Sequence, residues 1–190
     1  MAMPYVTSEM TSIMQYVEHE IDDPVLVQSL HFSPTALTLV RRVMMSGGSI
    51  ITDTTLALGD VDAEMARKLG VQLYCFIDDP RIVAIAEQKR ITRAEIALDY
   101  ALTLSGMKLL VVGSAPMALS RLLQRRQLEP LNDVVVLATP TGFASVVQLK
   151  ERVWESDLAS IVIRGKKGGA AASVAVLNAL MAESIKEQNL

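Results

Sequence analysis

The residues best suited to bind an anion lie together near the C-terminal end of the chain, in Arg164-Gly165-Lys166-Lys167-Gly168-Gly169. Glycines let backbone N–H groups approach a ligand closely, and the Ala-rich stretch that follows predicts a helix whose positive end faces the same place. The two lysines add charge, so the segment suits a carboxylate or a phosphate. A solvated turn with ordinary surface lysines explains these residues equally well.

Proton transfer near neutral pH is best served by histidine, and the sequence has two, His19 and His31. His19 lies between Glu18 and Glu20, a setting typical of a helix surface. His31 lies in an apolar stretch, which is typical of a half-buried position. Spacing alone does not choose between the two histidines as a proton donor.

Polar segments that favour helix starts follow the apolar runs of the chain. Asp79 and Ser114 are predicted N-caps, each with a proline close behind, and Thr92-Arg93-Ala94-Glu95 is a capping box. Arg93 is then expected to be a surface arginine that pairs with neighbouring carboxylates. Asp53 and the Asp78-Asp79 pair have the chemistry of metal ligands, but they suit caps and turns equally, and no His or Cys lies beside them in sequence. We expect no metal site.

Short apolar runs rich in β-branched residues predict the strands, and stretches with helical spacing lie between them. Because the runs are continuously apolar, they predict strands that are covered on both faces. The fold class is therefore α/β, a three-layer protein with a mainly parallel sheet of about five to six strands and helices on both faces. We expect one domain over residues 1–190, with a site at the carboxyl ends of the strands. The predicted strands span residues 49–52, 71–76, 108–112, 134–138 and 160–163.

Composition excludes several classes of function. The net charge is −3 and the pI is about 5.4, which argues against a general nucleic-acid binder. Cys75 is the single cysteine, so no intramolecular disulfide forms, and its apolar neighbours predict a small buried residue. The sequence has neither a phosphate-binding Walker motif nor a dinucleotide fingerprint, so no nucleotide cofactor is expected. Without a leader or a membrane-spanning run, the expected location is the cytoplasm.

The order of these motifs resembles one family, the precorrin-8X methylmutases, from His19 to Leu180. The segment His19-Glu20-Ile21-Asp22-Asp23-Pro24 is similar to that family's His-Ala-Thr-Gly-Asp-Pro, and Asp53-Thr54 is similar to the start of its Asp-Thr-Asn-Met. The other matches follow in the family's order: Phe32-Ser33-Pro34, Asp79-Pro80-Arg81, Thr92-Arg93, Ala115-Pro116-Met117-Ala118-Leu119, Gly142-Phe143, the glycine-rich segment at 164–169 and Leu177-Asn178-Ala179-Leu180.

This resemblance implies an isomerase (a methylmutase) of cobalamin biosynthesis that needs no cofactor. It would move a methyl group from C11 to C12 of precorrin-8X or cobalt-precorrin-8, giving hydrogenobyrinic or cobyrinic acid, with His19 as the general acid. It also implies an anionic tetrapyrrole ligand and a homodimer with the site near the interface, and no nucleic-acid or membrane partner. The substrate-binding residues that it implies are Asp23, Asp53, Thr54, Thr92, Arg93, Ser114, Pro116, Thr141, Gly142, Arg164, Lys166, Lys167, Gly168 and Gly169.

Four positions depart from the family pattern, and they keep two alternatives open. An arginine, an asparagine and two serines of the family are replaced by Tyr16, Thr55, Ala94 and Ala170. Only 18 residues precede His19, which predicts a short N-terminal part of the pocket. One alternative is a non-catalytic tetrapyrrole-binding or carrier relative. The other is an enzyme with a different acidic substrate on the same scaffold.

Overall fold

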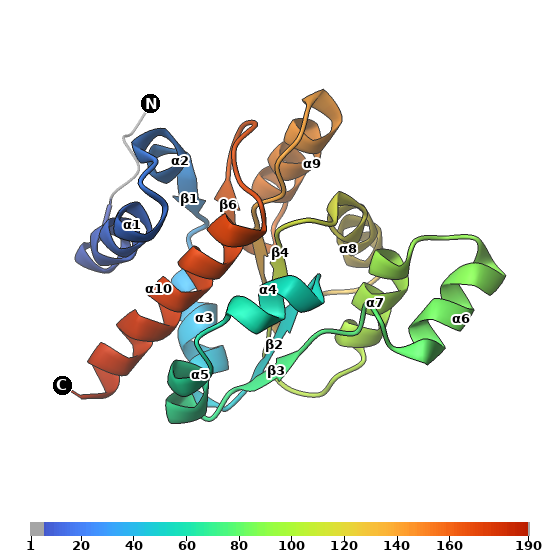
Figure 1. The fold of residues 1–190 in the computed structure, drawn as a ribbon, viewed down its shortest axis with the longest axis horizontal. Coiled ribbons are helices and arrows are strands. Elements are labelled where there is room, and N and C mark those ends of the chain that lie inside the picture. The colour runs from blue at the N-terminus through green and yellow to red at the C-terminus, as the bar shows by residue number, and fades with distance from the viewer. Residues whose placement is uncertain (1–5, 190) are drawn as a thin grey trace.

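The computed structural model describes residues 6–189, in which a six-stranded sheet lies between layers of helices (Figure 1). The strands are β1 (Leu30–Phe32), β2 (Ser49–Thr52), β3 (Gln72–Tyr74), β4 (Lys108–Val112), β5 (Val134–Ala138) and β6 (Ala159–Ile163). The helices are α1 (Ser8–Ile21), α2 (Pro24–Gln28), α3 (Ala36–Met45), α4 (Thr55–Asp60), α5 (Ala63–Leu69), α6 (Pro80–Lys89), α7 (Arg93–Leu102), α8 (Pro116–Leu128), α9 (Ala144–Glu155) and α10 (Ala170–Gln188).

The sheet has the strand order β1-β6-β5-β4-β2-β3. Strands β2 to β6 run parallel, and β1 pairs antiparallel with β6, so that His31 lies opposite Val162. The predicted α/β class and the mainly parallel sheet are therefore confirmed.

Alternate residues of the central strands bury against opposite helical layers, as the period of a strand requires. Leu109 and Val111 of β4 belong to the apolar core under α1, α3 and α10. Leu110 and Val112 belong to the core under α7, α8 and α9. Every residue of β2, β4, β5 and β6 is buried, which explains why these strands are continuously apolar in sequence.

The two edge strands differ most from the sequence prediction. β3 is shorter than the predicted 71–76 and is only partly buried, because it has a neighbour on one side alone. β1 was not predicted, since three residues with a central histidine carry too little periodicity to indicate a strand. His31 is half-buried on β1, as its apolar neighbours indicate.

Helix α6 extends from the edge of the molecule and packs mainly on α7 (Figure 1). The two helices share a small separate cluster of Ile82, Ala86 and Ile96, which Phe76 and Tyr100 cover. As predicted, Asp79 caps α6, accepting a hydrogen bond from the Arg81 N–H at 2.9 Å, and Pro80 is its first helical residue. The side-chain bond from Arg81 lowers the pKa of Asp79 to about 2.

In the described part of the chain, no helix has the length and apolar character needed to cross a membrane.

Candidate active site

The chain changes direction across the sheet between β2 and β4. From β2 it moves outward to β3, whereas from β4 it moves the other way to β5 and β6. The residues after these two strands therefore border a crevice at the carboxyl edge, which is where open α/β sheets bind ligands. Asp53 follows β2, and Ser114 follows β4.

Asp53 bridges this crevice. Its Oδ2 accepts hydrogen bonds from the backbone N–H groups of Ser114 and Ala115, both at 2.7 Å. The N-cap of α8 is Ala115, which makes no side-chain cap bond, and Pro116 is the first helical residue. The prediction that Ser114 caps α8 is therefore wrong, because a carboxylate from another strand end occupies the exposed amides before the helix.

The second oxygen of Asp53, Oδ1, is buried and has no hydrogen-bond partner within residues 6–189. A cavity of about 30 Å³, lined by Asp53 and by residues of β2, β4, α7 and α8, lies beside it. That volume holds a water molecule, which would supply the missing partner, but not a large ligand. Thr54 also has a structural task, since its Oγ1 accepts a hydrogen bond from Ala57 N–H at 3.1 Å and caps α4.

The glycine-rich loop, residues 164–169, is held against the segment that follows β5. Gly169 N–H donates to the Thr139 carbonyl at 2.6 Å, and the Thr141 hydroxyl donates to the Lys166 carbonyl at 2.9 Å. Gly142 N–H also approaches the Lys166 carbonyl, at 3.4 Å. Thr141 and Gly142 thus support the loop from behind.

Gly168 allows the closest approach in this region. Its φ is +142°, and a Cβ atom there would lie 1.9 Å from the Thr139 carbonyl oxygen. Gly169, with φ of +110°, leads directly into α10. Positive φ favours glycine at both positions, and at Gly168 the contact with Thr139 also leaves no room for a side chain.

The loop exposes backbone donors to solvent. Because the carbonyl of a trans peptide points away from the next N–H, the inward carbonyls of Lys166 and Lys167 direct the N–H groups of Lys167 and Gly168 outward. Within the described residues, neither N–H has an acceptor. Together with the N-terminus of α10, these amides provide hydrogen-bond donors suited to carboxylate or phosphate.

Two cations of the loop are already paired. Lys167 Nζ lies 2.5 Å from Asp23 Oδ2, and this bond lowers the pKa of the Asp23 carboxyl. Arg164 Nε lies 3.0 Å from Glu151 Oε1, and its guanidinium stacks over the Trp154 ring at 5.6 Å. Lys166 is exposed and forms no ion pair with the residues that the structure describes.

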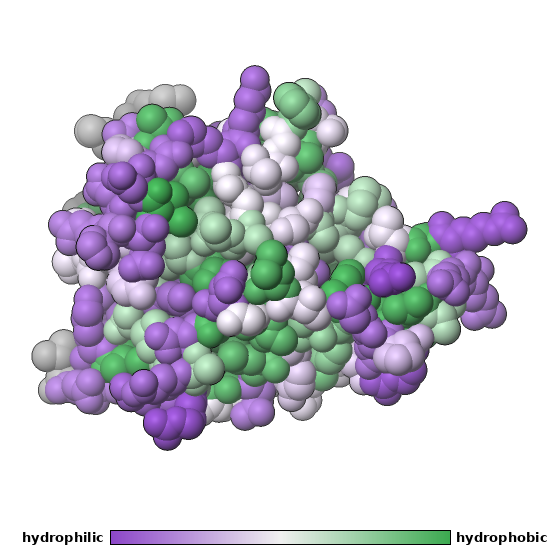
Figure 2. Space-filling view, viewed as in Figure 1, coloured by the Kyte–Doolittle hydropathy of each residue, from purple (hydrophilic) through white to green (hydrophobic). Residues whose placement is uncertain are grey.

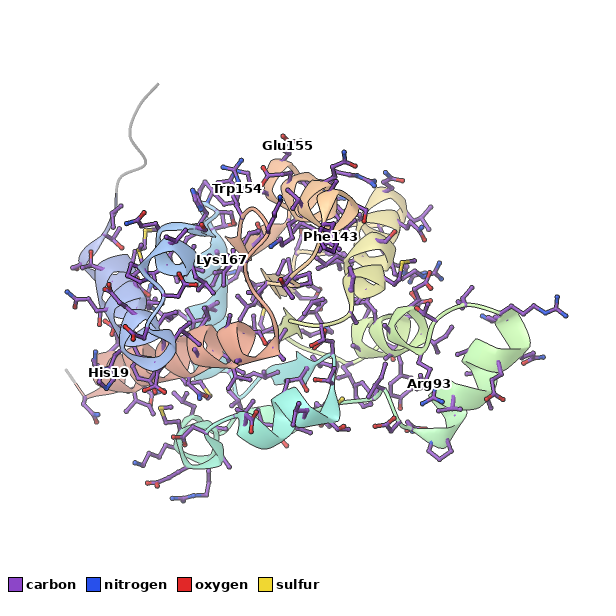
Figure 3. The ribbon with its side chains drawn as sticks, turned by 45° about the horizontal axis from the view of Figure 1, so that its top comes forward. His19, Arg93, Phe143, Trp154, Glu155 and Lys167 are labelled. Carbon is purple, nitrogen blue, oxygen red and sulfur yellow. The ribbon has the colours of Figure 1, made fainter. Side chains whose placement is uncertain are left out.

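His19 lies in the last turn of α1, exposed, four residues before Asp23. Four residues of chain span at most about 14 Å, so His19 is tethered near the glycine-rich loop through the Asp23–Lys167 pair. Arg93, in the first turn of α7, lies at the opposite end of the molecule (Figure 3). Its guanidinium pairs with Asp78 at 3.5 Å, and Thr92 and Glu95 form the predicted capping box. A single chain does not bring His19 and Arg93 together.

Sequence reasoning missed an apolar rim of exposed side chains around the carboxyl edge. The exposed fractions are 85% for Phe143, 71% for Leu56, 58% for Val25 and 44% for Met117. All four lie in or beside the first turn of a helix that begins near this edge. Figure 2 shows the apolar surface over α4, the helix that carries Leu56. Exposure of this kind is typical of a surface that contacts a ligand or another chain.

Metal-ligand geometry was not found: no group of three or more His, Cys, Asp or Glu side chains in residues 6–189 is placed to hold an ion. Asp53 and Asp79 bind backbone N–H groups instead. Cys75 is half-buried rather than fully buried as expected, and burial raises the pKa of its thiol.

A mainly parallel α/β sheet with polar loops gathered at its carboxyl edge defines the class of α/β proteins that bind ligands at that edge. Within that class, this chain belongs to the precorrin-8X methylmutase family, whose model matches residues 3–183. The resemblance seen in the sequence motifs is thereby confirmed.

Similar proteins are named as methylmutases of cobalt-precorrin-8 or precorrin-8X. The cobalt-precorrin-8 methylmutase of Salmonella typhimurium is 33% identical over 90% of this chain and 80% of its own length. The cobalt-precorrin-8 methylmutase of Methanothermobacter thermautotrophicus is 31% identical over 91% of this chain and 80% of its own length. The solved structure of precorrin-8x methyl mutase from Thermus thermophilus is 27% identical, with a TM-score of 0.85, covering 97% of this chain and 89% of that one. These relatives are isomerases of cobalamin biosynthesis.

Proposed function

We propose that this protein is an isomerase of corrin biosynthesis. It moves a methyl group from C11 to C12 of precorrin-8X or cobalt-precorrin-8 and releases hydrogenobyrinic or cobyrinic acid in the cytoplasm. The observation that carries the proposal is the Lys167–Asp23 ion pair, because it joins the segment that bears His19 to the glycine-rich loop. Family membership over nearly the whole chain supports the same activity.

The chemistry of the loop suits this substrate. A corrin precursor carries many acetate and propionate carboxylates around an apolar macrocycle. The outward N–H groups of Lys167 and Gly168, with the Lys166 ammonium beside them, suit the carboxylates. The exposed side chain of Phe143 follows Thr141 and Gly142, the residues that support the loop, and it suits the face of the macrocycle.

His19 is the general acid of the proposed reaction. Its imidazole is exposed to solvent, and in the protonated form it donates a proton to the macrocycle. The protonated ring system is then the electron-poor acceptor toward which the methyl group migrates. His31 is not suited to this task, because its Nδ1 bonds the Ser29 carbonyl at 2.9 Å and its ring packs edge-on against Trp154.

A homodimer completes the proposed site. His19 and Arg93 lie at opposite ends of one chain (Figure 3), so both reach one substrate only if two chains contribute to it. The crevice at Asp53 offers a cavity of about 30 Å³, far below the volume of a tetrapyrrole. The substrate would therefore lie across the exposed apolar rim, covered by the partner chain.

The experiment that tests the function is a visible absorption spectrum of wild type, H19A and H31A after mixing with precorrin-8X. Conversion to the corrin spectrum by wild type and H31A, with bound but unchanged substrate in H19A, is the expected result. Binding without conversion by wild type would show a tetrapyrrole carrier in place of an enzyme. Ala94 and Ala170, which replace serines of the family pattern, are the observation that favours that second candidate.

A further inference from the structure

Lys150 of α9 is fully buried, with 0% of its surface exposed. Its Nζ donates one hydrogen bond, to the backbone carbonyl of Lys167 at 2.9 Å. No carboxylate of the described residues lies within ion-pair distance of this ammonium. The other fully buried lysine, Lys108, differs: it pairs with Asp133 and also donates to the Gly106 carbonyl at 2.7 Å.

A buried ammonium without a counter-ion is costly, and a packed apolar side chain of similar length would fill the same space without that cost. Burial lowers the pKa of Lys150 to about 8. Structural stability alone therefore does not account for a lysine at this position, whereas the contact with the glycine-rich loop does.

The Lys167 carbonyl is the point where the charge of Lys150 acts on the loop. While Lys150 holds this carbonyl inward, the N–H of Gly168 points outward in the same peptide plane. The ammonium therefore lies on the carbonyl side of this peptide, opposite the outward N–H. A positive charge in a site of low dielectric strengthens the attraction for an anion bound in front of it.

We propose that Lys150 is a positioning residue of the anion site: it fixes the direction of the Gly168 amide and supplies a buried positive charge behind the loop. The identity of the anion as a substrate carboxylate rests on the proposed function. The role of Lys150 in positioning the loop does not depend on that function.

Other charges around Lys150 are already neutralised. Glu151 on its own helix is bound by Arg164, and this bond lowers the pKa of the Glu151 carboxyl. Lys167 on the loop is bound by Asp23. His31 on β1 is the remaining titratable group on this side, and it faces Glu151 and Trp154. Lys150 is therefore the group of this cluster whose ionisation changes at mildly alkaline pH.

The binding test compares wild type, K150M, K150R and K108M, with hydrogenobyrinic acid as the probe. We expect K150M to raise the dissociation constant about tenfold, the effect of losing one charge-assisted bond. K108M should bind like wild type but unfold at a lower urea concentration, because it leaves Asp133 without its partner. We expect the affinity of wild type to fall above pH 8, where Lys150 loses its charge. K150R should keep its affinity over that range. Equal affinities for wild type and K150M would overturn the proposal.

A ligand-free measurement separates this inference from the proposed function. Trp154 is the single tryptophan, and its ring contacts Arg164 at the start of the loop. Its fluorescence should change with a midpoint near pH 8 in wild type and K108M, and not in K150M. If no variant binds the corrin but this transition is present, the proposed function fails and the positioning role stands. A transition that persists in K150M would overturn the positioning role.

Discussion

Two glycines of the same loop show how differently a single position can be constrained. Gly165 and Gly168 both have positive φ, +77° and +142°. A Cβ at Gly165 would meet open space, whereas one at Gly168 would collide with the Thr139 carbonyl. The sequence shows both only as glycines. The difference depends on Thr139, 29 residues earlier in the chain, so it was not predictable.

We expect G168A to destabilise the protein by about 3 kcal/mol or more and to abolish corrin binding, because backbone must move to admit the methyl group. The matched variant G165A has only the conformational cost of a positive φ, about 1 kcal/mol, and should bind normally. Urea unfolding and a binding titration measure both effects. Equal losses in the two variants would contradict the close approach that Gly168 makes.

Lys150 did leave a signal in the sequence. Val146, Lys150 and Val153 have the spacing of one helix face, so a lysine interrupts the apolar stripe of α9. A polar residue in such a stripe indicates a specific buried partner. The sequence does not identify that partner, because the Lys167 carbonyl reaches it only through the pairing of β5 with β6.

At the scale of elements, the start of α8 depends on a residue of another element. Asp53 lies about 60 residues before the amides that it binds, and β2 and β4 bring them together through their parallel pairing. Local sequence rules predicted Ser114 as the cap because they consider neighbours along the chain alone. Thr54, Asp79 and Thr92 each cap a helix that starts at the next residue, so local rules are sufficient for them.

We expect D53A to lower the free energy of unfolding by about 2 kcal/mol, since two short bonds from backbone amides to a carboxylate are lost. D79A removes the cap of α6, which packs away from the sheet, and should cost less. Urea denaturation of both variants measures the difference. A smaller loss in D53A than in D79A would show that the bridge between β2 and α8 contributes little.

The ionisation of Lys150 makes the stability of α9 and its loop depend on pH. The pKa is about 8 in the folded chain and near 10.5 when the lysine is free in water, so the unfolded state binds more protons between these values. Burying the charged ammonium therefore destabilises the fold fully below pH 8. This destabilisation disappears as the pH rises to 10.5, a change in unfolding free energy of about 3 kcal/mol.

The unfolding free energy of wild type minus that of K150M should therefore rise between pH 8 and pH 10.5. The steepest slope is about 1.4 kcal/mol per pH unit. Denaturant titrations at matched ionic strength provide both curves, and the subtraction removes every other titrating group. A flat difference would mean that Lys150 does not titrate in this range.

At the scale of the whole molecule, the sequence predicted the layered architecture and the central strands, because buried parallel strands are continuously apolar. It also predicted that residues 141–142 and 164–169 lie at the carboxyl edge, where the structure places them together. It did not predict the separation of His19 from Arg93 (Figure 3). Both motifs lie in segments expected near the same edge of the sheet, but their order along the chain does not give their distance across it.

If two chains share each site, mixing two inactive variants should restore activity. In a mixed dimer of H19A and R93A, one of the two sites has both intact residues, and the other has neither. With random exchange, half of the dimers are mixed, so about a quarter of the wild-type rate is expected. Subunits exchanged under mild denaturant and assayed by corrin absorbance supply the measurement. No recovery, in material shown to be dimeric and exchanged, would show that His19 of one chain and Arg93 of its partner do not act on the same substrate.

Leu98 and Ala101 of α7 belong to one of the two cores of the sheet, whereas α6 packs mainly on the small apolar cluster that it shares with α7 (Figure 1). The amide hydrogens of α6 should therefore exchange with solvent through a local opening whose free energy is well below that of global unfolding. Amides of β4, β5 and α10, buried in the central layers, should exchange only when the whole chain unfolds. Arg93 lies in the first turn of α7, against which α6 packs, so we expect local opening of α6 to disturb the surroundings of Arg93 while the glycine-rich loop stays in place.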